Sequence, residues 1–218
     1  VSQITVTDLI ENYPGIPEGI NGFDLIERFK KQARQFGADM VSGDAGTIVK
    51  TRWNGIEGWE VRTGGKSYGA LAVIVATGAH WRRLGVAGEE TFIGKGVSFC
   101  ATCDGPFFRD REVAVVGGGN TAIQEALYLT HFARKVTGIH RRDRLRATGI
   151  LAQRAFDNPK IDFAWNAVVD EIAGAEGVQA VRIRDVKTSE IRTIPAEGVF
   201  IFVGLIPNTD FVRGLVEL

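Results

Sequence analysis

The sequence predicts an α/β fold in which parallel strands alternate with helices, and three patterns support this expectation. First, residues 112–116 form an apolar run that leads into a Gly-Gly-Gly turn and then into a helical pattern over 121–132. Second, a further predicted strand, 135–140, follows that helix, so the order strand, helix, strand indicates a parallel βαβ unit. Third, the unbroken apolar run 70–76 is typical of a strand buried on both faces, as parallel strands usually are.

In the N-terminal part of the chain, one amphipathic helix and several short strands are expected. Apolar side chains recur at helical spacing from Phe23 to Phe36, with charged side chains between them. This pattern predicts a helix over 22–36 that ends near Gly37. Short strands are expected around Met40, over 47–52 and over 59–63, with Gly64-Gly65 as a hairpin turn.

The C-terminal part continues the alternation and adds a group of strands. Residues 82–98 are glycine-rich and irregular, which is typical of a crossover between domains. A helix is expected over 148–156, and strands over 161–165, 168–173, 178–184, 191–194 and 198–203, of which the three between 168 and 194 form an antiparallel meander.

Composition and charge narrow the class of protein. The 218 residues are 44% hydrophobic and 24% charged, which is ordinary for a soluble protein of one large or two smaller domains. Lys+Arg and Asp+Glu number 26 each, so no net field favours a nucleic acid or a membrane surface. No apolar run approaches the ~18 residues that span a bilayer, and no signal-peptide pattern opens the chain. We therefore expect a cytoplasmic protein with neither nucleic-acid nor membrane partners.

The glycine-rich turn has the spacing of a dinucleotide-binding turn. Gly117 permits the tight turn, Gly119 lets the backbone approach a pyrophosphate, and the small Ala122 lets helix and strand pack closely. Asn120 and Thr121 open the helix, whose first N–H groups favour an anion. The alternative is a plain strand–helix connection, and the position of the turn between a buried strand and a helix favours the nucleotide.

The end of the second strand indicates which nucleotide. A site for NAD usually carries an acidic residue ~20 positions after the turn, where it binds the ribose 2′-hydroxyl. Here His140-Arg141-Arg142 begins 21 positions after Gly119, and Arg146 follows. Guanidinium groups suit a 2′-phosphate, because their geometry is bidentate and their charge permanent. A solvated basic loop explains the charge but not its position, so the pattern favours NADPH.

The two cysteines, Cys100 and Cys103, have a spacing found in half-sites for zinc, in structural disulfides and in redox couples. Zinc usually takes four ligands, and the chain has no second CxxC and only scattered histidines, so no metal is expected. Structural disulfides are rare in the cytosol. A redox couple remains, with Asp104 either as acid/base for the thiol proton or as a helix cap. Nicotinamide donates hydride whereas a disulfide accepts electrons through sulfur, so a flavin normally mediates between them.

Taken together, these motifs resemble the low-molecular-weight thioredoxin reductases, class II pyridine nucleotide-disulfide oxidoreductases that pass electrons from NADPH through FAD and a CxxC disulfide to thioredoxin. The resemblance extends over essentially the whole chain. Its motifs, in order, are Glu11-Asn12-Tyr13-Pro14-Gly15, Ala76-Thr77-Gly78-Ala79, Cys100-Ala-Thr-Cys103-Asp104-Gly105, Gly117-Gly-Gly-Asn-Thr-Ala122, His140-Arg-Arg-Asp143 with Arg146, and Gly204-Leu-Ile-Pro207-Asn208.

The resemblance implies a role for individual residues. Cys100 resembles the thiol that exchanges with thioredoxin, Cys103 the thiol nearer the flavin, and Asp104 the acid/base. The implied NADPH residues are Gly117, Gly119, Asn120, Thr121, Ala122, His140, Arg141, Arg142 and Arg146, and the implied FAD residues are Gln3, Asn12, Thr77 and Gly78.

The resemblance also implies two Rossmann-like, three-layer ββα-type nucleotide-binding domains and a homodimer. The expected division is a partial FAD-binding domain at 1–82, a complete NADPH-binding domain with the CxxC at 83–207, and a return into the FAD-binding domain at 208–218. The family's own FAD pyrophosphate turn and its C-terminal Gly-Asp do not occur within these 218 residues. We therefore expect this chain by itself to bind FAD weakly or not at all.

Two other functions remain open at this point, and a third is disfavoured by the CxxC. The reductase component of a peroxiredoxin system shares the scaffold, although Ala101-Thr102 between the cysteines favours thioredoxin reductase. Ferredoxin–NADP reductases of this scaffold lack the CxxC. A non-catalytic NADPH-binding fragment needs neither flavin nor thioredoxin.

Overall fold

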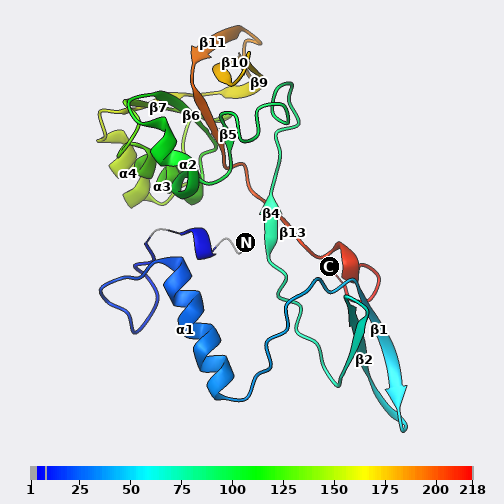
Figure 1. The fold of residues 1–218 in the computed structure, drawn as a ribbon. Coiled ribbons are helices and arrows are strands. Elements are labelled where there is room, and N and C mark those ends of the chain that lie inside the picture. Colours follow the sequence, from blue (N-terminus) through cyan, green and yellow to red (C-terminus); the bar gives the residue numbers. More distant parts are fainter. Residues whose placement is uncertain (1–3, 8, 218) are drawn as a thin grey trace. The chain divides into compact units, whose positions relative to one another are not determined.

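In the computed structural model, described for residues 4–7 and 9–217, the chain forms two compact units (Figure 1). Unit 1 comprises Val1–His80 and Ile206–Leu218, and unit 2 comprises Trp81–Leu205. The chain passes between them twice, in strands β4 (Ala79–Trp81) and β13 (Leu205–Pro207), which pair with each other. That these units are the FAD-binding and NADPH-binding domains stays a prediction.

Unit 2 is built around a five-stranded parallel sheet. Its strand order is β5-β12-β6-β7-β8. Successive side chains of a strand point to opposite faces, and both faces of this sheet are covered. The strands are β5 (Val97–Ser98), β6 (Glu112–Val116), β7 (Lys135–Ile139), β8 (Ile161–Ala164) and β12 (Gly198–Ile201).

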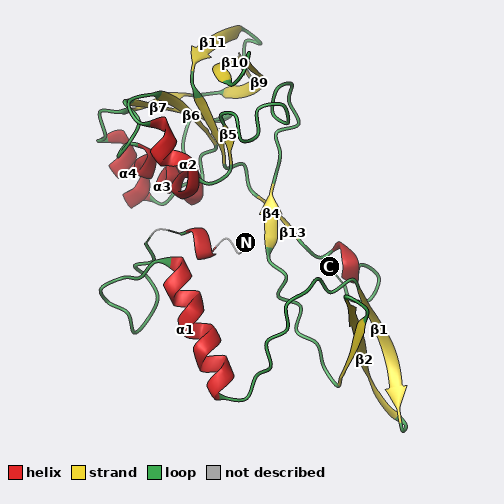
Figure 2. Ribbon diagram, in the orientation of Figure 1, coloured by secondary structure: helices red, strands yellow, loops and turns green. Residues whose placement is uncertain are grey.

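Helices cover one face of this sheet and a meander covers the other. Val113 and Val115 of β6 belong to the hydrophobic cluster formed with the helices, whereas Ala114 and Val116 belong to the cluster formed with the meander. Unit 2 therefore has the three-layer ββα arrangement that the sequence predicts (Figure 2). The helices are α2 (Ala101–Asp104), the 3₁₀ turn η2 (Gly105–Phe108), α3 (Asn120–Leu129) and α4 (Gly149–Phe156), and the meander is β9 (Ala167–Gly174), β10 (Val178–Asp185) and β11 (Ile191–Pro195).

Unit 1 contains one long helix and a small antiparallel sheet. Helix α1 begins at Asn21, whose side chain accepts a hydrogen bond from Asp24 N. A small hydrophobic cluster of Ile16, Ile20 and Leu25 packs at the amino end of this helix. The elements are the 3₁₀ turn η1 (Ile4–Val6), α1 (Gly22–Gln35), β1 (Thr47–Trp53), β2 (Ile56–Thr63), β3 (Lys66–Ala70) and the 3₁₀ turn η3 (Asp210–Val212), with strand order β1-β2-β3.

Most predicted elements of unit 2 are confirmed, and their ends shift by a few residues. The strand predicted over 112–116 is β6, and the predicted meander is β9, β10 and β11. The helix predicted over 121–132 ends earlier, at Leu129. In unit 1 the predicted hairpin turn at Gly64-Gly65 is confirmed between β2 and β3.

Two predicted strands of unit 1 are wrong. Met40 lies in irregular backbone. Of the apolar run 70–76, only Ala70 belongs to a strand, as the last residue of β3, and the rest of the run is a loop. Leu71 is 73% exposed and Ile74 is 93% exposed. A strand needs a neighbour for its backbone hydrogen bonds, and no described segment pairs with residues 71–78.

Candidate functional site

The two cysteines form a disulfide at the carboxyl edge of the parallel sheet of unit 2. Strand β5 ends at Ser98, and Cys100 is the N-cap of the short helix α2. Its Sγ accepts a hydrogen bond from the backbone N–H of Cys103 at 3.2 Å. The Cys100–Cys103 disulfide joins Cα atoms 5.3 Å apart. Cys103 is exposed and Cys100 is half-buried, so the pair is open to a reagent on the Cys103 side.

Neighbouring side chains fix the backbone around this disulfide. The hydroxyl of Ser98 accepts from Cys100 N at 3.1 Å, and it also lies 3.2 Å from Cys100 O. Glu125, from α3, accepts from Ala101 N at 3.0 Å. Asp104 lies at the end of α2 and makes no side-chain capping bond to the following 3₁₀ turn, so the predicted cap role is wrong.

The glycine turn is tightly packed at its first two glycines and open at the third. Gly117 has φ +143°, and a Cβ there would overlap Phe202 O and crowd Ala122. A Cβ at Gly118 would overlap the His140 ring. At Gly119, by contrast, a Cβ would meet only an Arg146 nitrogen at 3.9 Å, so open space lies beside this backbone. Helix α3 begins at that point without a side-chain cap, which leaves its N-terminal dipole available to an anion.

Backbone hydrogen bonds tie the arginine loop to the glycine turn. Gly118 O accepts from Arg146 N at 2.7 Å and from Ala147 N at 3.1 Å. Asn120 Oδ1 accepts from Thr148 N at 2.8 Å. Asn120, predicted to contact the nucleotide, therefore has its side-chain oxygen engaged in holding the loop. As a result, residues 146–148 are held directly against the turn.

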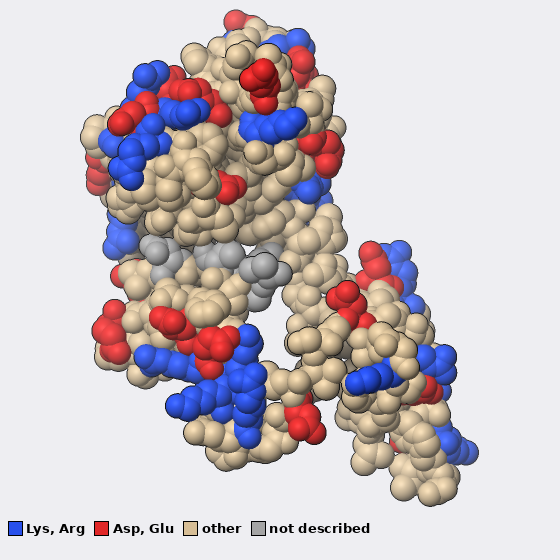
Figure 3. Space-filling view, viewed as in Figure 1, with Lys and Arg blue, Asp and Glu red and all other residues tan. Residues whose placement is uncertain are grey.

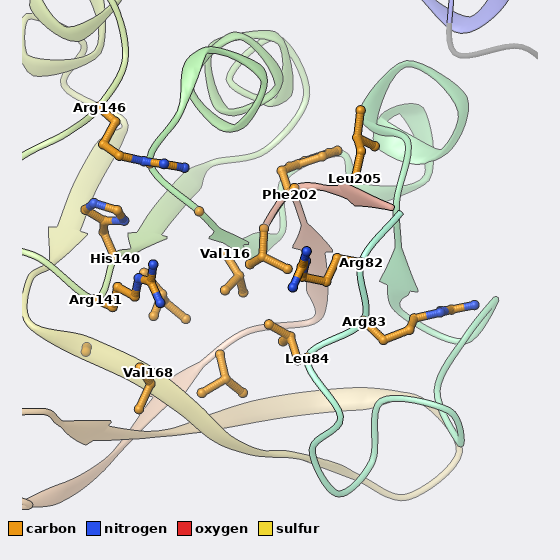
Figure 4. Close-up of a pocket in the computed structure, with 17 residues that line it drawn as sticks. Arg82, Arg83, Leu84, Val116, His140, Arg141, Arg146, Val168, Phe202 and Leu205 are labelled. Carbon is orange, nitrogen blue, oxygen red and sulfur yellow. The ribbon is translucent and has the colours of Figure 1, made fainter. Parts of the chain in front are cut away.

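A cavity of about 470 Å³ lies beside this turn, within unit 2 (Figure 4). Arg141 and Arg146 stand at one side of it, and Arg82 and Arg83 at the other. Its apolar wall comes from the ends of the strands and from the meander. The lining residues are Arg82, Arg83, Leu84, Val116, Gly117, Gly118, Ile139, His140, Arg141, Arg146, Ala167, Val168, Val169, Phe202, Val203, Gly204 and Leu205.

His140 is a buried, neutral member of this cavity. The residue is 5% exposed, and its Nε2 has no hydrogen-bond partner in the described part of the chain. Burial lowers the pKa of His140, and the charges of Arg146, Arg142 and Arg141 lower it further against the opposing effect of the Arg144 backbone. Its ring packs directly against Gly118, so His140 supports the glycine turn from below.

The structure separates the predicted residues of unit 2 into groups. Gly117, His140, Arg141 and Arg146 line the cavity, whereas Arg142, Thr121 and both cysteines do not. Val116, on the meander side of β6, lines the cavity, while Ala101, beside the disulfide, packs in the helix-side cluster. The cavity borders both clusters, since Phe202 of the helix-side cluster lines it as well, and the disulfide is not part of its lining.

The predicted FAD residues belong to unit 1. Gln3 lies outside the described residues, and Asn12 is exposed in a loop. Thr77 donates its hydroxyl hydrogen to Asn208 O at 2.6 Å, and its own carbonyl accepts from Asn208 Nδ2 at 3.0 Å. Gly78 has φ +68° with open space at its Cβ position, so a ligand could approach its backbone. Gly78 therefore fits a nucleotide contact, whereas the Thr77 hydroxyl is already engaged.

Sequence reasoning missed three residues near these sites. Arg82 lines the cavity from a loop that lies outside the βαβ motif. Glu89, 1% exposed, accepts from Leu84 N and Gly85 N and so fixes this loop. Glu125 reaches Ala101 from 24 positions away. An acidic residue inside an otherwise apolar helix face was the available signal for Glu125.

The described surface carries both signs of charge. Figure 3 shows Lys and Arg interspersed with Asp and Glu on the visible face of each unit. Among the described residues, no helix is long and apolar enough to cross a membrane. In the same part of the chain, no cluster of three or more His, Cys, Asp or Glu could hold a metal ion.

Comparison with known proteins identifies the family. A family model described as pyridine nucleotide-disulphide oxidoreductase matches residues 1–218. Thioredoxin reductase of Treponema pallidum is 44% identical over 210 residues, covering 96% of this chain and 67% of the relative. Thioredoxin reductase of Bacillus subtilis is 46% identical over 206 residues, covering 94% and 64% respectively. Thus the chain spans about two thirds of the length of these relatives.

Comparison with solved structures also finds thioredoxin reductases. Lactococcus lactis thioredoxin reductase in its FR conformation superposes with a TM-score of 0.90 at 41% identity, over 98% of this chain and 69% of that one. Thioredoxin reductase from T. acidophilum gives a TM-score of 0.87 at 33% identity, over 96% and 67%. The chain therefore belongs to the pyridine nucleotide-disulphide oxidoreductase family, within its thioredoxin reductase branch.

Proposed function

We propose that the protein containing this chain is an NADPH-dependent flavoprotein disulfide reductase, which passes electrons from NADPH through FAD to the Cys100–Cys103 disulfide and on to thioredoxin. The observation that carries the proposal is the presence, in one unit, of the Cys100–Cys103 disulfide and of a cavity lined by the glycine turn, Arg141 and Arg146. The relatives named thioredoxin reductase support the same reaction.

The glycine turn and the cations beside the cavity have a consistent role in binding NADPH. The open backbone at Gly119 and the uncapped start of α3 receive the pyrophosphate. Arg141 and Arg146 bind the 2′-phosphate through charge-assisted hydrogen bonds, with Arg142 as a solvent-side contributor. The buried ring of His140 lies beneath the turn and lines the cavity, so we assign it a supporting role there.

Neither cysteine lines the cavity, so a nucleotide bound there does not reach the disulfide directly. FAD, when bound, supplies a two-electron carrier that accepts hydride and reduces a disulfide. Asn12, Thr77, Gly78 and Gln3 are the residues of this chain that we assign to it.

The cysteines and Asp104 perform the exchange with thioredoxin. Reduction of the pair by two electrons and two protons breaks the S–S bond and leaves two thiols. A thiolate at Cys100 attacks the thioredoxin disulfide and displaces one of its sulfurs as a thiolate. Cys103 then attacks the mixed disulfide, which re-forms the Cys100–Cys103 bond and releases reduced thioredoxin. Asp104, next to Cys103, removes the proton from the attacking thiol. We assign the protein to the cytoplasm and expect a homodimer.

Replacing Cys103 by Ser in the FAD-loaded protein tests this function. We expect NADPH still to bleach the flavin absorbance near ~450 nm, while thioredoxin reduction falls to background because no disulfide can form. The bleaching is the internal control for folding and for NADPH binding. Unchanged thioredoxin turnover by the Cys103→Ser variant would contradict the proposal.

A further inference from the structure

An acidic side chain stands at the amino end of the helix that carries the cysteines. Glu125, half-buried on α3, accepts the backbone N–H of Ala101 at 3.0 Å. Ala101 follows Cys100 directly and is fully buried, so water is not an available partner for this N–H. Glu125 therefore supplies the acceptor that the buried amide requires.

The same contact changes the electrostatics of the sulfur atoms. N–H groups at the start of a helix stabilise a thiolate at the N-cap, and the Cys103 N–H already points to Cys100 Sγ at 3.2 Å. The Ala101 N–H would add to this effect, but it is directed to a carboxylate instead. A full negative charge one peptide unit from Cys100 opposes formation of the thiolate.

The other charged and titratable groups around the pair are few. Asp104 is the acid of α2 itself, and neither η2 nor β5 carries an ionisable side chain. Helix α3, which packs against α2, contributes Glu125 and the phenol of Tyr128. The guanidinium of Arg83 lies 4.3 Å from the centre of the Phe99 ring, next to Cys100. Glu125 is thus the acid from a neighbouring element that contacts the cysteine backbone directly.

We infer that Glu125 is a positioning residue for the Cys100–Cys103 pair: its carboxylate fixes the amino end of α2 and, once the disulfide is reduced, favours the thiol over the thiolate at Cys100. The reduced pair then keeps its proton near neutral pH, which gives the acid/base assigned to Asp104 a proton to move. The inference deepens the proposed function and rests on it for its biological meaning. Its test requires neither FAD, NADPH nor thioredoxin.

The experiment measures how alkylation of the reduced cysteines depends on pH. Dithiothreitol reduces the disulfide, is itself oxidised to a cyclic disulfide and leaves two thiols in the chain. After its removal, iodoacetamide is added from about pH 6 to about pH 10, and peptide mass spectrometry follows Cys100 and Cys103 separately. Glu125→Gln keeps an oxygen acceptor for Ala101 N–H and removes the charge, whereas Glu125→Asp keeps the charge.

We expect Glu125→Gln to move the midpoint of Cys100 alkylation down by about one pH unit. Because a less basic thiolate is also a weaker nucleophile, the rate near neutral pH rises only about three- to fourfold. Glu125→Asp should retain the wild-type midpoint. Glu112→Gln is the matched control: Glu112 is paired with Arg134 at 3.1 Å and starts β6, at the opposite edge of the sheet from Cys100.

A Glu125→Gln profile that superimposes on the wild type would overturn the inference, as would an equal shift in Glu112→Gln. Because no flavin is involved, such a result would leave the proposed reductase function standing. Conversely, a wild-type protein that does not reduce thioredoxin, together with the expected shift of the Cys100 alkylation midpoint in Glu125→Gln, would count against the proposed function alone.

Discussion

The two units of the chain bury their apolar side chains to different extents. In unit 2, alternate residues of β6 enter two large clusters, and β12 is buried at every position. In the described part of unit 1, the cluster at the start of α1 contains Ile16, Ile20 and Leu25, while Leu71 and Ile74 are exposed. A parallel strand needs at least one neighbouring strand for its backbone hydrogen bonds, and each strand of the parallel sheet has one within unit 2. Unit 2 therefore has the features of a self-sufficient core.

Substitutions at buried and exposed apolar residues are expected to give the largest difference between the two units, in the free energy of unfolding. Phe200 is 0% exposed and packs edge-on against Phe108, so Phe200→Ala should lower the free energy of unfolding by about 3–5 kcal/mol. Ile74 is 93% exposed, and Ile74→Ala should change the free energy of unfolding by less than about 0.5 kcal/mol. Urea unfolding followed by circular dichroism measures both. Similar losses for the two variants would show that the apolar run of unit 1 is buried in solution.

Removing cations from unit 2 is expected to weaken nucleotide binding, whereas removing cations from unit 1 is not. The double variant Arg141→Ala/Arg146→Ala removes guanidinium groups from the cavity, and we expect the Kd for NADP⁺ to rise on the order of 100-fold. The Kd for NAD⁺, which lacks the 2′-phosphate, should change little. In unit 1, Arg28→Ala/Lys31→Ala removes the same charge from exposed positions of α1 and serves as the control. Calorimetric titration gives each value, and equal losses for both nucleotides would refute the 2′-phosphate assignment.

The smallest expected effect distinguishes two adjacent glycines of the turn. Gly119 has extended backbone and open space, so Gly119→Ala should fold normally yet weaken NADP⁺ binding by about tenfold, because the methyl group occupies the approach of the pyrophosphate. Gly118→Ala forces a methyl group into the His140 ring and should instead lower thermal stability. Comparing melting temperature with Kd for both variants tests this, and the reverse pattern would contradict the assigned roles.

The sequence predicts an element well when the pattern that defines it is local, and poorly when the element depends on contacts with distant segments. Strand β6, helix α3 and strand β7 are local and alternate regularly, so their existence could be predicted. The run 70–76 has the composition of a buried strand, but composition says nothing about whether a neighbouring strand is present. Its prediction failed for that reason.

The candidate site shows the same limit. The glycine turn, the cysteines and the cations after β7 are visible in the sequence because their spacing carries the chemistry. Asn120, whose predicted contact with the nucleotide stays a prediction, also accepts a hydrogen bond from Thr148 N, and Glu125 reaches Ala101 across 24 positions. Contacts of this kind depend on how helices pack, which no local pattern encodes.

Counting thiols tests most directly the separation of the nucleotide cavity from the disulfide. The protein containing this chain is incubated with NADPH under anaerobic conditions, and its thiols are titrated with and without bound FAD, with dithiothreitol as the positive control. Since Cys100 and Cys103 do not line the cavity, we predict no thiols with NADPH alone and both thiols when FAD is bound. Thiols that appear with NADPH in the absence of flavin would contradict this arrangement.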